Sequence, residues 1–357
     1  MPRDPDLPPL FSRTEAIAAG MTRHQVANRV RTQAWRALRR DVYCRTALYD
    51  ELSPRDQHLL AVLATLRTRG DDELASHLSA ACVLDLPLPL DHPDEVVTLT
   101  CTDISRSTRH YPRLLVQVAS TGDRERTVRH VSVAGHREPV RMTTAARTVA
   151  DNLRHLHTPD GVALADAALR RELTSHEAVS AALDRQSDWP YAERGHLAAR
   201  LVDPRRETWL ESHSFVRLHL LGLPMPEPQV VIRDGKGEPV ARVDGWFDDC
   251  ALVLEADGRE KYFLGEDGLP PDLDAGADEL RRRLARSMEQ QSRRERTLRD
   301  LGVGIERWGT NDAVRHTRDL LARLQAARAR GDRSRFRGHT TYLPSPPWLE
   351  PARRRAS

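Results

Sequence analysis

The pattern of apolar and polar positions in the first 45 residues predicts two short helices followed by a hairpin. Ser12 with Glu15, and Thr22 with Gln25, each have the spacing of a capping box at a helix start. A glycine-containing turn separates the two helices. Apolar residues interleaved with arginines over residues 35–43 then indicate two short strands. This order is typical of a helix-turn-helix with a small basic wing.

Residues 53–202 combine helical stripes with strand-like runs. Pro54 stands at a helix start, and a second helix is expected near residues 73–84. Strand-like runs follow at EVVTLTCT, RLLVQVAS and RHVSVAG. Helical patterns then extend from TTAARTVADNL through GVALADAALRREL to TSHEAVSAAL. We expect an α+β middle region.

A third pattern begins after Asp203 and Pro204. The helical run RETWLESHSFVRLHLLGL precedes three strand-like runs, VVIRD, VARVDGWF and ALVLEAD, that turns separate. A charged helix, LRRRLARSMEQQSRRERTLRDLG, precedes the strand-like GIERW and a last helix, DAVRHTRDLLARLQAAR. This order defines a third domain at residues 205–327.

The histidines and cysteines give no sign of a metal centre. The middle-region histidines have no metal-binding spacing and are expected to be surface or core residues: His77, His130 and His136. The four cysteines are scattered without a CxxC pair, so neither a structural zinc site nor a disulfide framework is indicated. A reducing cytoplasm fits this pattern.

Charge and hydropathy restrict the partners. The formal net charge is +3, with basic residues clustered toward both ends of the chain. Residues 328–357 mix Arg, Pro and Ser with little apolar periodicity, which predicts a disordered basic tail that either touches nucleic acid weakly or is only solvated. No apolar run approaches the roughly 18 residues that span a membrane, and MPRDPDLPPL lacks the apolar core of a signal peptide. We therefore expect a cytoplasmic protein without membrane contact.

Two of the strand-like runs carry an acid in mid-run, Asp244 and Glu255. Strands normally exclude unpaired carboxylates, so these charges need a partner. A turn of two or four residues after Phe247 would place Asp244 across from Val253 and on the same sheet face as Glu255, with Asp257 beyond. A turn of odd length would put the two acids on opposite faces.

Converging carboxylates repel one another unless a cation lies between them, and oxygen ligands suit Mg²⁺ or Mn²⁺. Such a metal lowers the pKa of bound water and stabilises charge on a phosphodiester. Lys261 could orient the water or neutralise the transition state, and Glu211 on the preceding helix could complete the cluster.

A structural role for the same acids is the alternative. Asp244 could pair with Arg242 or Arg259 on a solvated face, because exposed ion pairs of this kind are common. Asp257 would then belong to a turn, and Glu211 would be a surface helix residue.

The second short helix, TRHQVANRV, has the division of faces that a recognition helix needs. Val26 and Val30 can face the core while the polar residues face outward: Arg23, His24, Gln25, Asn28 and Arg29. Arg39 and Arg40 would then meet phosphates from the wing. The alternative is a small helical module that binds protein.

A family resemblance adds to this interpretation. ESHSFVR, GLPMPEPQV, ARVDGWF, LVLEADGREKY, RRERTLRDLG and IERW, in that order, resemble the restriction-endonuclease-like domain related to very-short-patch-repair endonucleases. The first 45 residues resemble the winged-helix domain of AbiEi-type antitoxins of type IV toxin–antitoxin systems, and the whole chain resembles actinobacterial proteins that join these halves. The expected fold is multidomain α+β: a winged helix-turn-helix at 1–50, an α+β middle region at 53–202, a restriction-endonuclease-like α/β domain at 205–327, and the basic tail.

The resemblance also implies roles for single residues. Asp244 and Glu255 fall on the metal-binding acids of the PD-(D/E)XK pattern, with Asp257 where that pattern usually has its lysine, and Lys261 could supply the amine from a displaced position. A recurring pair on the following helix, expected to orient the acids or touch phosphate, is matched by Arg294 and Glu295. The proline-rich start replaces the usual first helix of the winged domain, which would reduce DNA affinity.

Two functions follow as expectations. The first is a DNA-associated protein with a winged-helix reader and a Mg²⁺-dependent endonuclease domain that uses no organic cofactor. The second is a non-catalytic antitoxin or transcriptional regulator whose nuclease fold only recognises nucleic acid or a partner, such as a cognate toxin. A pure interaction module is a third alternative.

Overall fold

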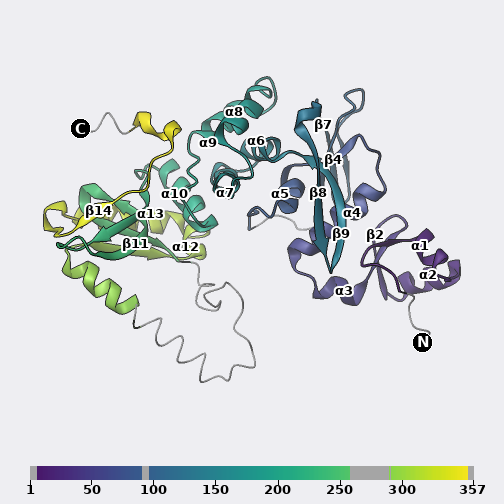
Figure 1. The fold of residues 1–357 in the computed structure, drawn as a ribbon, viewed down its shortest axis with the longest axis horizontal. Coiled ribbons are helices and arrows are strands. Elements are labelled where there is room, and N and C mark those ends of the chain that lie inside the picture. Colours follow the sequence, from purple (N-terminus) through teal and green to yellow (C-terminus); the bar gives the residue numbers. More distant parts are fainter. Residues whose placement is uncertain (1–5, 91–95, 258–288, 290, 353–357) are drawn as a thin grey trace. The chain divides into compact units, whose positions relative to one another are not determined.

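The structure is a computed structural model that describes residues 6–90, 96–257, 289 and 291–352 (Figure 1). Its described part holds three β-sheets, of three, five and six strands, together with many helices, so the expected α+β class is confirmed. The chain divides into two compact units. The first unit comprises Met1–Leu156 and Arg171–His196, and the second comprises His157–Arg170 and Leu197–Ser357. Within the described residues, no helix is both long and apolar enough to cross a membrane.

The N-terminal part of the first unit has the predicted helices and hairpin. The Ser12 hydroxyl accepts a hydrogen bond from the Glu15 amide at 3.1 Å, and the Thr22 hydroxyl accepts one from the Gln25 amide at 3.2 Å, so both capping boxes are confirmed. Phe11 and Trp35 pack edge to face with ring centroids 4.6 Å apart, at the centre of a small core. The elements are α1 (Arg13–Ala18), α2 (Arg23–Arg31) and a sheet in the order β1-β3-β2, from β1 (Phe11–Ser12), β2 (Trp35–Arg39) and β3 (Val42–Arg45).

The remainder of the first unit is built on a mixed sheet in the order β6-β7-β5-β4-β9-β8. Its strands are β4 (Glu73–Ala75), β5 (Val97–Cys101), β6 (Arg109–Tyr111), β7 (Leu114–Val118), β8 (Arg126–Val133) and β9 (His136–Thr143). Its helices are α3 (Thr46–Glu51), α4 (Pro54–Arg67), α5 (His77–Val83), α6 (Ala145–His155) and α8 (His176–Asp184), while α9 (Ala192–Ala199) extends past the boundary of the unit.

Two of the differences between this sheet and the sequence prediction concern β4 and β9. The helix expected over residues 73–84 begins only at His77, because the three residues of β4 are buried between two neighbouring strands. Strand β9 was not predicted, because its sequence HREPVRMT begins with charged residues that hide the β pattern. It nevertheless pairs with β8 along its whole length.

A cluster of buried charges holds the helical side of the first unit together; we call it the α6 ion cluster. The carboxylate of Asp151 is fully buried and accepts hydrogen bonds from Arg147 Nε at 2.9 and 3.0 Å. Arg154 Nη2 and Gln186 Nε2 also donate to Asp151 Oδ1, at 3.4 and 3.1 Å. Arg147 Nη1 donates to Glu125 Oε2 at 3.0 Å. The cluster therefore connects α6 to the segment before β8 and to the segment after α8.

Replacing Asp151 by Ala should destabilise the first unit strongly, because two buried guanidinium groups would lose their counter-charge. We expect the free energy of unfolding to fall by about 3–5 kcal/mol, the range measured when one partner of a buried ion pair is removed. Urea denaturation at neutral pH measures this change. Asp184→Ala, which removes an exposed acid, is the control. A loss below about 1 kcal/mol for Asp151→Ala would contradict a central role for the cluster.

The second unit contains a five-stranded sheet with both faces covered. Alternate residues of one strand pack into different cores. Leu252 and Leu254 belong to a core with Phe215 and Leu320, while Val253 belongs to a second core with Trp246 and Leu298. This explains the continuous apolar run ALVLEA. The strand order is β13-β12-β11-β10-β14, from β10 (Glu227–Arg233), β11 (Pro239–Phe247), β12 (Leu252–Ala256), β13 (Gly304–Trp308) and β14 (His339–Thr341). The helices are α7 (Thr158–Arg170), α10 (Trp209–Leu220), α12 (Thr310–Val314), α13 (Thr317–Arg330) and residues 291–300.

Two expectations about the borders of this unit need correction. Helix α7 was expected in the middle region, but it packs against α10, and its buried Asp166 pairs with Arg206 at 2.8 Å. The expected disordered tail is ordered in part, because His339–Thr341 pairs with β10 and Phe336 packs on Trp246 with ring centroids 5.5 Å apart. The Arg-rich composition hid these few ordering contacts.

Candidate functional site

The turn between β11 and β12 has the even length on which the acidic site depends. Phe247 pairs with Leu252, so four residues form the turn. Val253 pairs with Trp246, however, and not with Asp244 as predicted from the shorter turn. The register therefore moves Asp244 two positions further along β12, to the neighbourhood of Glu255.

Asp244 and Glu255 lie where the β11–β12 ladder ends. The last paired residues are Gly245 and Leu254. Beyond them, the Ala256 amide donates to Asp244 Oδ2 at 2.9 Å, so a side chain takes the place of a backbone acceptor. The Asp244 carboxylate thus reaches the residue that directly follows Glu255.

Glu255 has a positively charged neighbour. Its side chain is buried, and Arg294 Nη2 donates to Glu255 Oε1 at 2.7 Å. The same nitrogen donates to the Arg242 carbonyl at 2.6 Å. Arg294 therefore connects the helix at 291–300 to both β11 and β12. The orienting role that the resemblance implies for Arg294 stays a prediction.

Glu211 is a buried helix residue and not the surface residue of the alternative interpretation. It is 1% exposed, and its carboxylate accepts hydrogen bonds from the Thr208 hydroxyl at 2.9 Å and the Glu207 amide at 3.0 Å. Gln229 Nε2 donates to it at 2.9 Å. These bonds stabilise the start of α10 and fix the carboxylate next to β10.

Gln229 is a site residue that the sequence prediction missed. It lies between the pairs Pro228–Gly245 and Val230–Val243, which makes it the neighbour of Asp244 across the strands. Its φ is +55°, a backbone conformation that residues other than glycine seldom adopt and that clusters at functional sites. The signal in the sequence was a polar amide between apolar strand positions. Gln229 thus bonds the Glu211 carboxylate and lies across the strands from Asp244.

Asp257 belongs to a different ion pair. Arg307 Nε lies 3.6 Å from Asp257 Oδ2, and Arg307 Nη1 also contacts Glu295. Asp257, which the resemblance places at the usual lysine position of the PD-(D/E)XK pattern, therefore has a cationic neighbour on β13. Lys261 lies outside the described residues, so its predicted role stays a prediction.

The acid pair offers oxygen donors for a divalent cation. Mg²⁺ is usually bound by one or two carboxylates, with waters and substrate phosphates completing its shell, so Asp244 and Glu255 are sufficient in number. A metal ion there would compete with Arg294 for Glu255. In the described part of the chain, no group of three or more His, Cys, Asp or Glu side chains is arranged to hold a metal.

The predicted outward face of α2 is largely confirmed. Val26 is buried and Val30 is partly buried in the small N-terminal core. The exposed side chains are Arg23, His24, Gln25 and Asn28, while Arg29 is half-buried. Two of the polar groups already have local bonds: Gln25 Oε1 caps the Thr22 amide at 2.7 Å, and Asn28 Oδ1 accepts from Arg31 at 2.7 Å.

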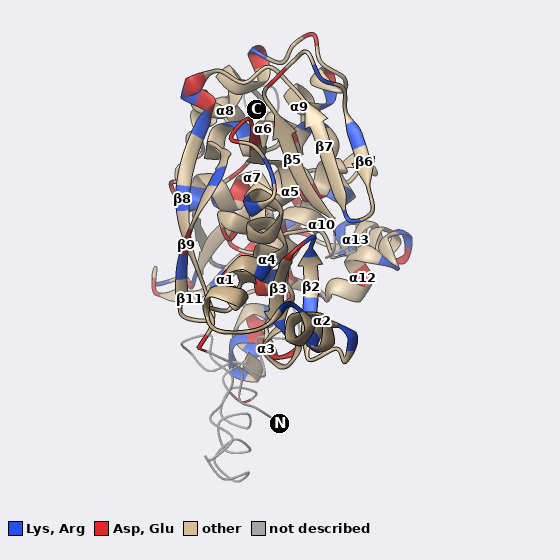
Figure 2. Ribbon diagram, turned by 90° about the vertical axis from the view of Figure 1, so that its right-hand side faces the viewer, with Lys and Arg blue, Asp and Glu red and all other residues tan. Residues whose placement is uncertain are grey.

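The two predicted wing arginines differ in their surroundings. Arg39 is directed into the first unit, where Nε donates to the Thr65 hydroxyl at 2.8 Å and Nη2 to the Arg113 carbonyl at 3.0 Å. Arg40 is 96% exposed, with Asp41 3.9 Å away. Figure 2 shows basic positions on α2 and β2. Arg40 is thus better placed than Arg39 for a phosphate contact.

Comparisons with known proteins do not assign the chain. No family model matches it. No curated protein matches it either. The resemblances stated above therefore remain expectations.

Replacing Arg294 by Ala should destabilise the second unit, because the buried Glu255 carboxylate would lose its charged donor. We expect a loss of about 1.5–3 kcal/mol in the free energy of unfolding, the usual contribution of a hydrogen bond to a charged group. Urea denaturation in EDTA measures it. Arg296→Ala removes an exposed arginine of the same helix and serves as the control. If both variants unfold like the parent protein, the Arg294–Glu255 contact does not contribute to the free energy of unfolding.

Proposed function

We propose that this chain is a DNA-associated protein that combines a winged-helix reader in residues 1–50 with a Mg²⁺-dependent, restriction-endonuclease-like phosphodiesterase domain in the second unit. One observation carries the proposal. Asp244 and Glu255 lie on neighbouring strands just beyond the last pair of the β11–β12 ladder, and the Asp244 carboxylate accepts a hydrogen bond from the amide of Ala256. Two carboxylates at neighbouring strand positions supply oxygen ligands of the kind that suit a divalent cation.

The surrounding residues have roles that suit this chemistry. When bound, Mg²⁺ would activate a water and neutralise charge on a phosphodiester. Asp244 and Glu255 supply carboxylate oxygens, while Glu211 and Gln229 hold the neighbouring strand in its strained conformation. Arg294 balances the charge of Glu255 when no metal is present. When a metal displaces Arg294 from Glu255, the guanidinium can contact a phosphate.

Asp244→Asn tests this site without removing its shape. Asparagine keeps an oxygen that can accept from Ala256, but it lacks the charge that holds a cation. We expect Mg²⁺ to raise the melting temperature of the parent protein and to support nicking of plasmid DNA. Asp244→Asn should abolish the stabilisation and lower the nicking rate at least about 100-fold, corresponding to about 3 kcal/mol.

Asp300→Asn, which neutralises an exposed acid, is the matched control and should behave like the parent protein. Melting curves in EDTA and in Mg²⁺, beside the nicking assay, separate the possible outcomes. The absence of any response to Mg²⁺ in the parent protein would refute the metal site. Stabilisation by Mg²⁺ without cleavage of DNA or RNA would refute the enzymatic part alone.

A specific contact favours the second candidate function, a non-catalytic antitoxin-type regulator. The guanidinium of Arg294 already compensates the charge of Glu255 at 2.7 Å, and Arg307 does the same for Asp257. Such a site is stable without a metal. In this case the winged helix would bind an operator, and the second unit would recognise nucleic acid or a toxin protein.

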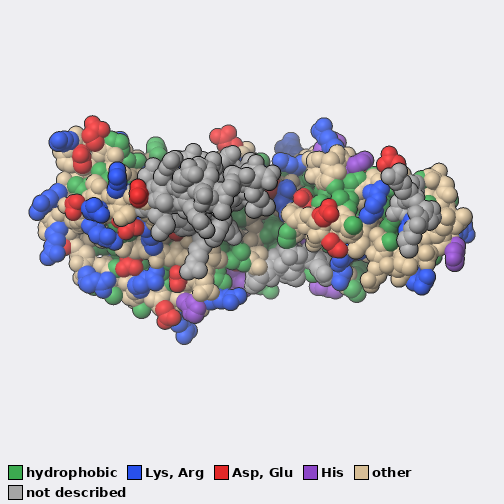
Figure 3. Space-filling model, turned by 90° about the horizontal axis from the view of Figure 1, so that it is seen from below, with side chains coloured by type: hydrophobic (Ala, Val, Ile, Leu, Met, Phe, Trp, Pro, Cys, Tyr) green, Lys and Arg blue, Asp and Glu red, His purple; other side chains and the backbone are tan. Residues whose placement is uncertain are grey.

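The reader is proposed for both functions and can be tested by the salt dependence of DNA binding. On one face of the second unit, basic and acidic side chains are interspersed (Figure 3), which does not favour a single basic contact patch there. We expect Arg40→Ala to lower the slope of log K against log salt by about 0.9, the value for one lost phosphate contact. Arg137→Ala, at an exposed arginine of β9, should leave the slope unchanged. An unaltered slope for Arg40→Ala would remove the wing from the DNA interface.

A further inference from the structure

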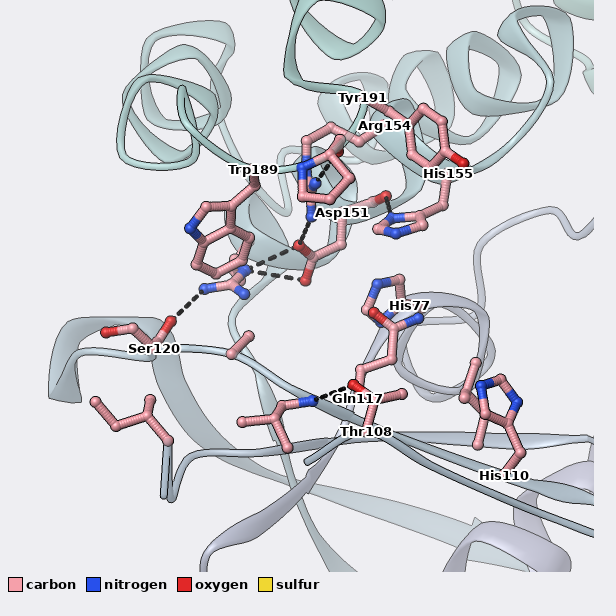
Figure 4. A pocket seen from close by; sticks show the side chains of 16 residues that line it. His77, Thr108, His110, Gln117, Ser120, Asp151, Arg154, His155, Trp189 and Tyr191 are labelled. Atoms are coloured by element: carbon pink, nitrogen blue, oxygen red, sulfur yellow. Dashed lines mark hydrogen bonds and ion pairs between the residues drawn. The ribbon is translucent and has the colours of Figure 1, made fainter. Parts of the chain in front are cut away.

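The first unit contains a pocket that is separate from the acidic site and whose chemistry the sequence did not reveal. Its volume is about 790 Å³, within the range of pockets that bind small molecules. Residues of β7 and the loop before β6 form one side, and α6 and residues 189–191 form the other (Figure 4). The α6 ion cluster supplies its polar wall: Arg147, Asp151 and Arg154 all line the pocket.

Two buried nitrogen atoms of this pocket have no hydrogen-bond partner among the described residues. Arg147 is 1% exposed; its Nε and Nη1 are bonded within the α6 ion cluster, but its Nη2 has no acceptor. His77 is 7% exposed; its Nδ1 lies 3.0 Å from the Ser76 hydroxyl, but its Nε2 has no partner. A buried polar nitrogen without a hydrogen-bond partner is unfavourable, so both nitrogen atoms indicate a ligand that would bond them.

The charge of the pocket wall indicates the charge of that ligand. The charged side chains that line the pocket are two arginines, Arg147 and Arg154, and one carboxylate, Asp151, so the pocket wall carries one positive charge in excess. Burial lowers the pKa of His77 to about 4, so its imidazole is neutral at pH 7 and adds no charge. An oxyanion would therefore satisfy the free N–H of Arg147 and balance the excess charge.

The other lining residues are rich in aromatic rings. The guanidinium carbon of Arg147 lies 4.7 Å from the centroid of the Trp189 ring, and that of Arg154 lies 5.2 Å from it. The rings of His77 and His155 meet edge to face at 4.8 Å, and His155 lies 6.0 Å from Tyr191. Trp189 is thus fixed by two cations, while Tyr191 is 60% exposed at the pocket rim. Such rings favour a ligand with a flat π-system.

The backbone of the pocket is also held in an unusual conformation. His77 has φ +50° and Tyr191 has φ +65°, although neither is glycine. Strained residues of this kind persist where the surrounding structure fixes them, and they cluster at ligand sites. Here they direct two aromatic side chains to the same pocket.

We propose that this pocket binds a small aromatic anion, in which an oxyanion meets Arg147 and His77 and a flat ring packs against Trp189 and Tyr191. The oxyanion can be the carboxylate of an aromatic acid or the phosphate of a nucleotide. This assignment does not depend on the function proposed for the second unit, because none of its residues belongs to that unit.

Calorimetric titration of the full chain tests the proposal with paired probes. The aromatic anions are 4-hydroxybenzoate and adenosine 5′-monophosphate, their uncharged counterparts are 4-hydroxybenzamide and adenosine, and the anions without a ring are acetate and inorganic phosphate. We expect at least one aromatic anion to bind with a Kd below about 1 mM and at least about tenfold more tightly than both its matched compounds. Binding of the benzoate alone identifies a carboxylate site, and binding of the nucleotide alone identifies a phosphate site.

Variants then locate the bound probe. His77→Asn, which keeps a residue that tolerates positive φ, and Trp189→Leu should each weaken binding at least about tenfold. Tyr191→Ala is the further variant if either of these fails to fold, because the Tyr191 ring is exposed and its removal leaves the core intact. His130→Asn and Tyr111→Ala are matched controls outside the pocket. The proposal is wrong if neither aromatic anion binds below about 1 mM, or if binding is the same in the parent and pocket variants.

Discussion

The burial of carboxylates, and the arginines that compensate them, is the constraint on which both units depend. Of the 55 basic residues in the chain only Lys236 and Lys261 are lysines, so a cation that pairs with a buried acid is nearly always a guanidinium. A guanidinium is planar, always charged and able to bond several acceptors at once, which suits it to buried pairs. Asp151 receives bonds from two arginines, Asp166 pairs with Arg206, and Glu255 pairs with Arg294.

These pairs fix the positions of elements that are distant in sequence. The α6 ion cluster joins helix α6 to residues 125 and 186, and helix α6 also forms part of one side of the pocket in the first unit. The pair of Arg294 and Glu255 similarly joins a helix to the middle of the sheet in the second unit. Because a buried charge without its partner is costly, each pair permits few alternative arrangements of the elements around it. In both candidate sites, ion pairs therefore fix the positions of the charged side chains before any ligand binds.

The sequence predicted best what depends on neighbours along the chain. Ser12 and Thr22 marked two helix starts correctly, since a capping box is complete within four residues. The sequence left the length of the turn before β12 open, and the structure has the even turn, with Val253 paired to Trp246 and not to Asp244. Patterns of this kind are local, and the hydrophobic period together with capping and turn residues is enough to recognise them.

Features that arise from tertiary contacts were missed. The positive φ of Gln229 and the free Nη2 of Arg147 depend on elements that come together only in the fold. His77 appeared to be an ordinary histidine, because its spacing in sequence says nothing about the rings of residues 155 and 191. Arg39 was expected at phosphate, but an acceptor 74 residues away, the Arg113 carbonyl, holds it inside the first unit. Long-range partners cannot be read from periodicity.

The short strand β14 has a consequence for the order in which the second unit can be completed during synthesis. It pairs with the last three residues of β10, Val231 to Arg233, and the Arg233 and Thr341 side chains that bond across this pair are 108 residues apart. Until the segment near residue 340 has left the ribosome, β10 presents an open edge with apolar neighbours. Open edges recruit strands from other chains, so the nascent protein passes through a stage at which association competes with closure of its own sheet.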